Sequence, residues 1–131
     1  MGPLSHSTLI IVEAGASGAG LTGRVLGQAD GESIPGFVAR VRGAVAQDAG
    51  LQRVVLVAGG VHDFARIAAR ADIARTAAQC VAAGGGGSLV LASSDVRGEL
   101  AQRALGEILR EQLGSSVRVS IAAFDAGAIA A

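Results

Sequence analysis

The stretch LVLASSDVRGELAQRALGEILREQL, from Leu89 to Leu113, decides the expected fold of this 131-residue chain. It starts as an apolar strand pattern, passes through a Ser-Ser-Asp turn and continues as an amphipathic helix pattern. A helix that follows a buried strand directly is typical of parallel sheets, because a crossover must return the chain before the next strand begins. The stretch therefore predicts an α/β domain.

Similar strand patterns occur elsewhere in the chain. The four expected strands are Thr8–Glu13, Arg53–Ala58, Ser88–Ser93 and Val117–Phe124. The first three are nearly continuous in apolar residues, as in strands that are covered on both faces. The sequence predicts a single domain over residues 1–131, with a small Rossmann or flavodoxin-like parallel sheet of about four strands flanked by helices on both faces.

The segments between the strands show helical patterns. A short helix is expected through Leu26, and residues 26–36 are expected to join two helices. No strand is expected between Gly20 and Leu51, which leaves Thr8–Glu13 as an apolar edge that something must cover.

The longest helix pattern follows Asp63, which is a suitable N-cap. Its apolar stripe is expected to begin with Phe64 and Ile67 facing inward. Three arginines of the same helix are expected on a solvated face: Arg66, Arg70 and Arg75.

Composition excludes several classes of function. The eleven basic residues, all Arg, balance eleven acidic ones, and only three aromatic residues occur, so nucleic-acid binding is not expected. Cys80 is the only cysteine, which leaves no disulfide framework, and no metal site is expected. Because no apolar run is long enough to span a membrane, the protein is expected to be cytoplasmic.

A glycine-rich loop follows the first strand as VEAGASGAG, Val12–Gly20, at the place where nucleotide-binding folds approach a pyrophosphate. From this loop the chain resembles the short-chain dehydrogenases/reductases, whose T-G-x-x-x-G-x-G turn is matched at Glu13, Ala14, Gly18 and Gly20. LQRVVLVAGG and GGGGSLVLASSDVRG are similar to the family's fourth and fifth strands. The resemblance places Ser94 at the position of the catalytic serine.

The departures from this family concern its chemistry. Glu13 would put a negative charge beside a pyrophosphate, and no Tyr or Lys occurs to form the Tyr-x-x-x-Lys motif. Against the resemblance, no cofactor is therefore expected, and the glycines of the loop are expected to be vestigial: Gly15, Gly18 and Gly20.

The resemblance implies a non-catalytic reductase-like subunit of a fatty-acid or polyketide pathway, which forms oligomers with itself or with a related full-length enzyme. Family members associate through the helices that match Asp63–Ala83 and Gly98–Leu113, so Ala78 and Ala104 are expected at the contact.

The alternative is a cofactor-independent enzyme or ligand-binding protein, for example a cyclase or dehydratase. It would use the cleft at the carboxyl ends of the strands, with His62, Ser94 and Asp95 as candidate catalytic residues. The structural alternative for this region is that Asp63 and Asp95 are N-caps of the helices that follow them.

Overall fold

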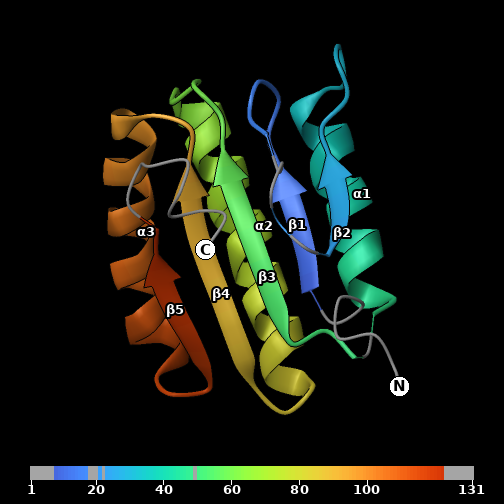
Figure 1. Cartoon of the computed structure of the whole chain (residues 1–131), viewed down its shortest axis with the longest axis vertical. Coiled ribbons are helices and arrows are strands. Elements are labelled where there is room, and N and C mark those ends of the chain that lie inside the picture. Colours follow the sequence, from blue (N-terminus) through green and yellow to red (C-terminus); the bar gives the residue numbers. More distant parts are fainter. Residues whose placement is uncertain (1–7, 18–20, 22, 49, 123–131) are drawn as a thin grey trace.

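The computed structural model describes residues 8–17, 21, 23–48 and 50–122. Its elements are β1 (Thr8–Val12), β2 (Arg24–Gly27), α1 (Ile34–Ala46), β3 (Arg53–Ala58), α2 (Phe64–Ala83), β4 (Gly87–Ser93), α3 (Val96–Leu113) and β5 (Val117–Ile121). The five strands form one parallel sheet in the order β2-β1-β3-β4-β5 (Figure 1). This is the flavodoxin-like order, so the predicted fold class is confirmed with one strand more than expected.

The additional strand is β2, in a segment that the sequence assigns to a short helix. Leu9 pairs with Arg24 and Val12 with Gly27, so β1 lies inside the sheet rather than at its edge. β2 is only four residues long and mostly exposed, and it carries no buried run that would reveal it. Residues 26–36 accordingly join a strand to a helix, and the prediction of a helix–helix connection is wrong.

All three helices pack on one face of the sheet. The main core joins side chains of α1, α2 and α3, among them Phe37, Ile73 and Leu109, to one face of the strands. The opposite face has a smaller cluster around Ile10 and Val55, to which no helix of the described residues contributes. The prediction of helices on both faces is therefore wrong for the described part of the chain.

Chain direction explains this one-sided packing. The steps from β2 to β3, β3 to β4 and β4 to β5 all cross the sheet in the same direction. Right-handed crossovers that advance in one direction place their helices on the same face. Only the step from β1 to β2 runs the other way, and its connection includes Ala16 and Leu21, which pack on the opposite face.

The buried face of α2 differs from the expected one. Phe64 is 87% exposed and Ile67 is 42% exposed, whereas Arg66 and Arg70 are buried. The cause is a polar cluster at the end of the sheet, described below, which draws both arginines inward. Ala78 is fully buried in the main core, so it cannot contribute to a contact between subunits as expected.

Candidate functional site

The carboxyl ends of β1, β3 and β4 meet at the edge of the sheet where α2 and α3 begin (Figure 1). After β1 the chain forms β2, which lies on one side of β1 in the sheet. It then crosses to β3, which lies on the other side of β1, so the strand order reverses at β1. Open α/β sheets bind their ligands at such a reversal of strand order. This edge is the candidate functional site.

An internal ion pair occupies the reversal point. Glu13, directly after β1, meets Arg70 of α2 with Oε2 2.6 Å from Nε and Oε1 2.7 Å from Nη2. Both side chains are only 2% exposed. Gly59, directly after β3, donates its backbone N–H to Glu13 Oε1 at 3.0 Å. The Glu13 carboxylate thus accepts hydrogen bonds from N–H groups that a bound anion would otherwise use.

The backbone is also tightly packed where the strand order reverses. A Cβ added to Gly59 would lie 2.4 Å from the carbonyl oxygen of Ala14, which shows how closely the loops after β3 and β1 approach. Glycine is required at position 59 for this contact. The loops after β3 and β1 are therefore in direct backbone contact at this point.

His62 extends the cluster toward α3. Its Nε2 lies 3.0 Å from Asp95 Oδ1, and its Nδ1 lies 3.5 Å from Arg70 Nη1. In the tautomer that carries its proton on Nε2, the ring donates to Asp95 and presents Nδ1 as an acceptor to the Arg70 guanidinium, which can only donate. Both ring nitrogens therefore face protein groups, and the ring is 13% exposed.

Asp95 serves as the N-cap of α3, as the sequence predicts. Its Oδ1 accepts the backbone N–H of Gly98 at 2.7 Å. The pKa of the Asp95 carboxyl is lowered, chiefly by this hydrogen bond and further by His62 and by the charge of Arg97. The carboxylate thus stabilises a helix start and orients a histidine at the same time.

Ser94 forms its hydrogen bond with the backbone. Its hydroxyl donates to the carbonyl oxygen of Ala58 at 2.9 Å, which ties the turn after β4 to the end of β3. The neighbouring Ser93 hydroxyl donates to the Asp95 carbonyl oxygen at 3.1 Å. Of the three candidates, the structure brings His62 and Asp95 into contact and gives Ser94 a backbone partner.

Asp95→Ala is expected to lower the free energy of unfolding by about 1 kcal/mol through loss of the cap. The lowered pKa of Asp95 determines how its contribution to the free energy of unfolding depends on pH. The contribution of Asp95 is complete well above the ordinary carboxyl value of 3.8 and is lost as the pH falls through the lower pKa of the folded state. Urea denaturation of both proteins across this range measures the difference.

Ser94→Ala is the matched control and should cost no more than Asp95→Ala. The structural role of Asp95 is contradicted if Asp95→Ala leaves the unfolding free energy unchanged at neutral pH.

The polar cluster has a second part, formed by Arg66 and Gln28, which the sequence does not predict. Arg66, 9% exposed, donates from Nη1 to Gln28 Oε1 at 2.7 Å, and the same oxygen accepts the backbone N–H of Ala14 at 3.2 Å. Gln28 in turn donates to the carbonyl oxygen of Glu32 at 3.0 Å. These bonds hold the loops after β1 and β2 against α2. A sequence signal did exist, because Arg66 and Arg70 fall on the same helical stripe as Ile73.

The glycine-rich loop is described only in part. Gly15 is exposed, has a φ of 84°, and has open space where a Cβ would lie. The predicted vestigial positions Gly18 and Gly20 lie outside the described residues. The loop's backbone is therefore not a basis for assigning a phosphate site.

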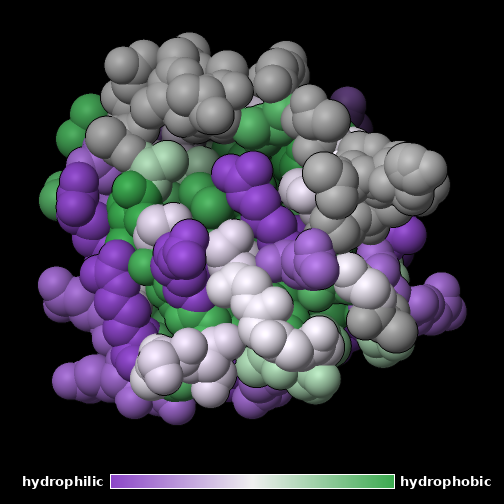
Figure 2. All heavy atoms as spheres, turned by 60° about the horizontal axis from the view of Figure 1, so that its bottom comes forward, coloured by the Kyte–Doolittle hydropathy of each residue, from purple (hydrophilic) through white to green (hydrophobic). Residues whose placement is uncertain are grey.

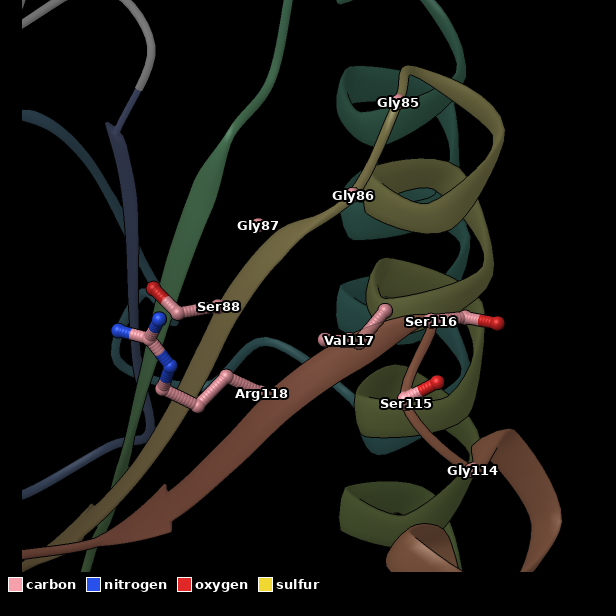
Figure 3. A pocket seen from close by; sticks show the side chains of 9 residues that line it. All are labelled: Gly85, Gly86, Gly87, Ser88, Gly114, Ser115, Ser116, Val117 and Arg118. Carbon is pink, nitrogen blue, oxygen red and sulfur yellow. The ribbon is translucent and has the colours of Figure 1, made fainter.

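A groove of about 630 Å³ lies at the opposite end of the sheet, where β4 and β5 begin. Figure 2 turns this end forward, and Figure 3 shows the groove, in which Arg118 and Ser88 extend to one side and Ser115 and Ser116 to the other. α2 and α3 end here, and helix C-termini carry partial negative charge. Arg118 is the only ionisable residue in the described lining. The groove lacks the paired groups that acid–base chemistry requires.

The residues that the structure describes lack two further features. No three His, Cys, Asp or Glu side chains among them come together as ligands for a metal ion. Within the same part of the chain, no helix is both long and apolar enough to cross a membrane.

Comparison of the chain with protein-family models, with curated proteins and with solved structures finds no match.

Proposed function

We propose that this chain is a non-catalytic, reductase-like subunit that acts by associating with itself or with a related full-length reductase. One observation carries the proposal: the Glu13–Arg70 pair fills the point where a flavodoxin-like sheet binds its ligand. The pair is hydrogen-bonded to Gly59 and almost inaccessible to water. A dinucleotide would have to displace a buried carboxylate and then face its charge.

The remaining polar groups of the edge support the same conclusion. Ser94 binds a backbone carbonyl, and His62 has a protein group within reach of each ring nitrogen. A general base needs a nitrogen or oxygen that can reach the substrate proton. In this arrangement the polar groups stabilise the turns that start α2 and α3.

The association surface is formed by α2 and α3. An apolar groove of about 250 Å³ runs between the two helices. Its lining includes two exposed apolar side chains, Ile108 at 51% and Ile67 at 42%. The same two helices carry two more, Phe64 at 87% and Leu100 at 64%. We call this region the α2–α3 surface. Exposed apolar side chains beside an apolar groove are typical of an interaction site.

The partner class is taken from the resemblance. Reductase-like domains that lack a cofactor site occur beside active enzymes in fatty-acid and polyketide pathways. A full-length reductase of such a pathway is therefore the proposed partner if the chain does not pair with itself alone.

The second candidate function is a cofactor-independent enzyme, and the His62–Asp95 contact is the observation that favours it. A carboxylate that orients a histidine is common to many acid–base sites. Asp95 is 40% exposed, so one side of this pair reaches solvent. Such an enzyme would require His62 to change partners when substrate binds.

Calorimetric titration with NAD⁺, NADH, NADP⁺ and NADPH tests the proposal. No heat of binding is expected for nucleotide concentrations up to about 1 mM, a range that would reveal binding free energies down to about 4 kcal/mol. The physical reason is the buried Glu13 carboxylate. Glu13→Gln removes its charge and serves as the comparison.

A dissociation constant in the low micromolar range for the wild-type chain would overturn the proposal. The enzyme candidate gains instead if His62→Gln keeps full thermal stability but abolishes a measured biosynthetic activity.

A further inference from the structure

We infer that a row of side chains on the face of the sheet to which no described helix contributes binds the phosphate group of a small sugar phosphate. The row is formed by Arg53, Ser88 and Arg118, near the end of the sheet where β3, β4 and β5 begin. This site lies at the opposite end of the strands from the Glu13–Arg70 pair. It is therefore independent of the proposed subunit function.

The register of the strands brings the three residues together. Arg53 pairs with Ser88, and Ser88 pairs with Arg118, so they occupy one line across three neighbouring strands. Adjacent strands lie about 4.8 Å apart, which places the two arginine Cα atoms roughly 10 Å from each other. Two long side chains that start at this separation can converge on one ligand above the serine.

Strand alternation assigns these side chains to one face of the sheet. Val55 belongs to the cluster on the face without a described helix and follows Arg53 by two positions. Side chains two positions apart on a strand share a face, and Val90 stands in the same relation to Ser88. Figure 3 shows Arg118 extending from β5 to the same side as Ser88 from β4.

Both arginines of the row are available to a ligand. Each is exposed, and neither forms a salt bridge within the described part of the chain. The five strands of the described sheet contain no acidic residue. The chain as a whole has no net charge, so the row is a local excess of two positive charges. Such an excess favours an anion that carries two negative charges.

The donor groups of the row match a phosphate monoester better than a carboxylate. Each guanidinium presents a planar fork of N–H groups, and the serine hydroxyl adds a further donor. A phosphate monoester offers three terminal oxygens and close to two negative charges at neutral pH. A carboxylate has two oxygens and one charge, which a single arginine already satisfies. The phosphate alone uses all three side chains.

The groove beside the row fits a ligand body that is rich in hydroxyl groups. Ser88, Ser115, Ser116 and Arg118 are among its lining residues, and its volume of about 630 Å³ suits a small molecule. α2 and α3 end at this groove, and the last carbonyl groups of a helix lack partners within the helix. Sugar hydroxyls can donate to such carbonyls. The described lining contains no aromatic side chain on which a nucleotide base would stack.

A titration followed by NMR tests the site with glucose 6-phosphate as the probe. The backbone amide signals of Ser88 and Arg118 are expected to shift with saturation, at a dissociation constant of about 1 mM or less. The signals of Glu13 and Gly59, at the other end of the sheet, should stay in place. Inorganic phosphate, which lacks the hydroxyl-rich body, and gluconate, which carries a carboxylate instead of the phosphate, should each bind at least about tenfold more weakly.

Three variants of the row and one matched control make the result specific. Arg53→Gln and Arg118→Gln should each lower the affinity at least about tenfold, because each removes a charged fork. Ser88→Ala removes a neutral hydrogen bond and should lower it about threefold. Arg24→Gln is the control, since Arg24 is also an exposed strand arginine but pairs with Leu9 of the main core and lies on the opposite face. Its affinity should equal that of the wild type.

Several outcomes would overturn the inference. These are the absence of saturable shifts up to about 10 mM glucose 6-phosphate, an unchanged affinity in Arg118→Gln, and equal affinities for glucose 6-phosphate and inorganic phosphate. Tighter binding of AMP than of glucose 6-phosphate would assign the groove to nucleotides instead. A dinucleotide that shifts the signals of Glu13 and Gly59 contradicts the proposed function and leaves the sugar phosphate site unaffected.

Discussion

Arg70→Met is expected to lower the free energy of unfolding by about 3–5 kcal/mol. The substitution removes the guanidinium but leaves the Glu13 carboxylate in a site where each side chain is 2% exposed. A buried charge without its partner loses hydration and gains nothing in return. The carbonyl oxygen of Val61, which accepts from Arg70 Nη2 at 3.1 Å, also loses its donor. Urea denaturation at neutral pH measures the loss.

Two further variants make this result specific. Arg75→Met changes an exposed arginine on the same helix and should alter stability by less than about 0.5 kcal/mol. Glu13→Gln combined with Arg70→Met removes both charges and keeps an oxygen for the Gly59 N–H, so at least half of the lost stability should return. An equal cost for Arg70→Met and Arg75→Met would show that the buried pair does not support the fold.

Gly87→Ala is expected to destabilise the protein by about 2–3 kcal/mol. A Cβ at this position would lie 2.0 Å from the carbonyl oxygen of Gln52 and 2.9 Å from Cγ1 of Val81. The carbonyl of Gln52 accepts the backbone N–H of Ser88 at 2.9 Å, so it cannot retreat without breaking that hydrogen bond. The backbone of β4 must therefore shift at its first residue.

Gly43→Ala in α1 is the matched control for this substitution. Nothing lies within 4 Å of its added Cβ, and alanine favours a helix over glycine by about 0.5–1 kcal/mol. The two identical chemical changes should thus move the midpoint of thermal unfolding in opposite directions. A small effect of Gly87→Ala would mean that the start of β4 can move away from the loop before β3.

The strands of the sheet could be predicted to the extent that they are buried. β1, β3 and β4 carry apolar runs, and each was expected within a residue or two of its observed bounds. β2 gave no such signal, because its stability comes from the hydrogen-bonded ladder with β1 and not from burial of its own side chains. Without β2, the direction of the first crossover could not be known, and the placement of all helices on one face could not be inferred.

The candidate site could be predicted only where its interactions are local. Asp63 and Asp95 each cap a helix that starts at the next residue, so the sequence predicts them. The partners Glu13 and Arg70 are 57 positions apart, and an arginine between alanines usually faces solvent. An acidic residue directly after a buried strand was the available signal that a buried cation must lie nearby.

The place of β1 in the sheet has a consequence for biosynthesis. β1 precedes both of its neighbours in the chain, yet it lies between them in the sheet. On the ribosome its apolar residues emerge before those of the other strands, and they lack one of their two neighbouring strands until β3 has been made, roughly two to ten seconds at ordinary rates of translation. β5, by contrast, emerges after β4, the one strand beside it in the described sheet. The nascent chain thus has its greatest need of a chaperone at Thr8–Val12, a segment whose residues 9–11 are fully shielded from water once folding is complete.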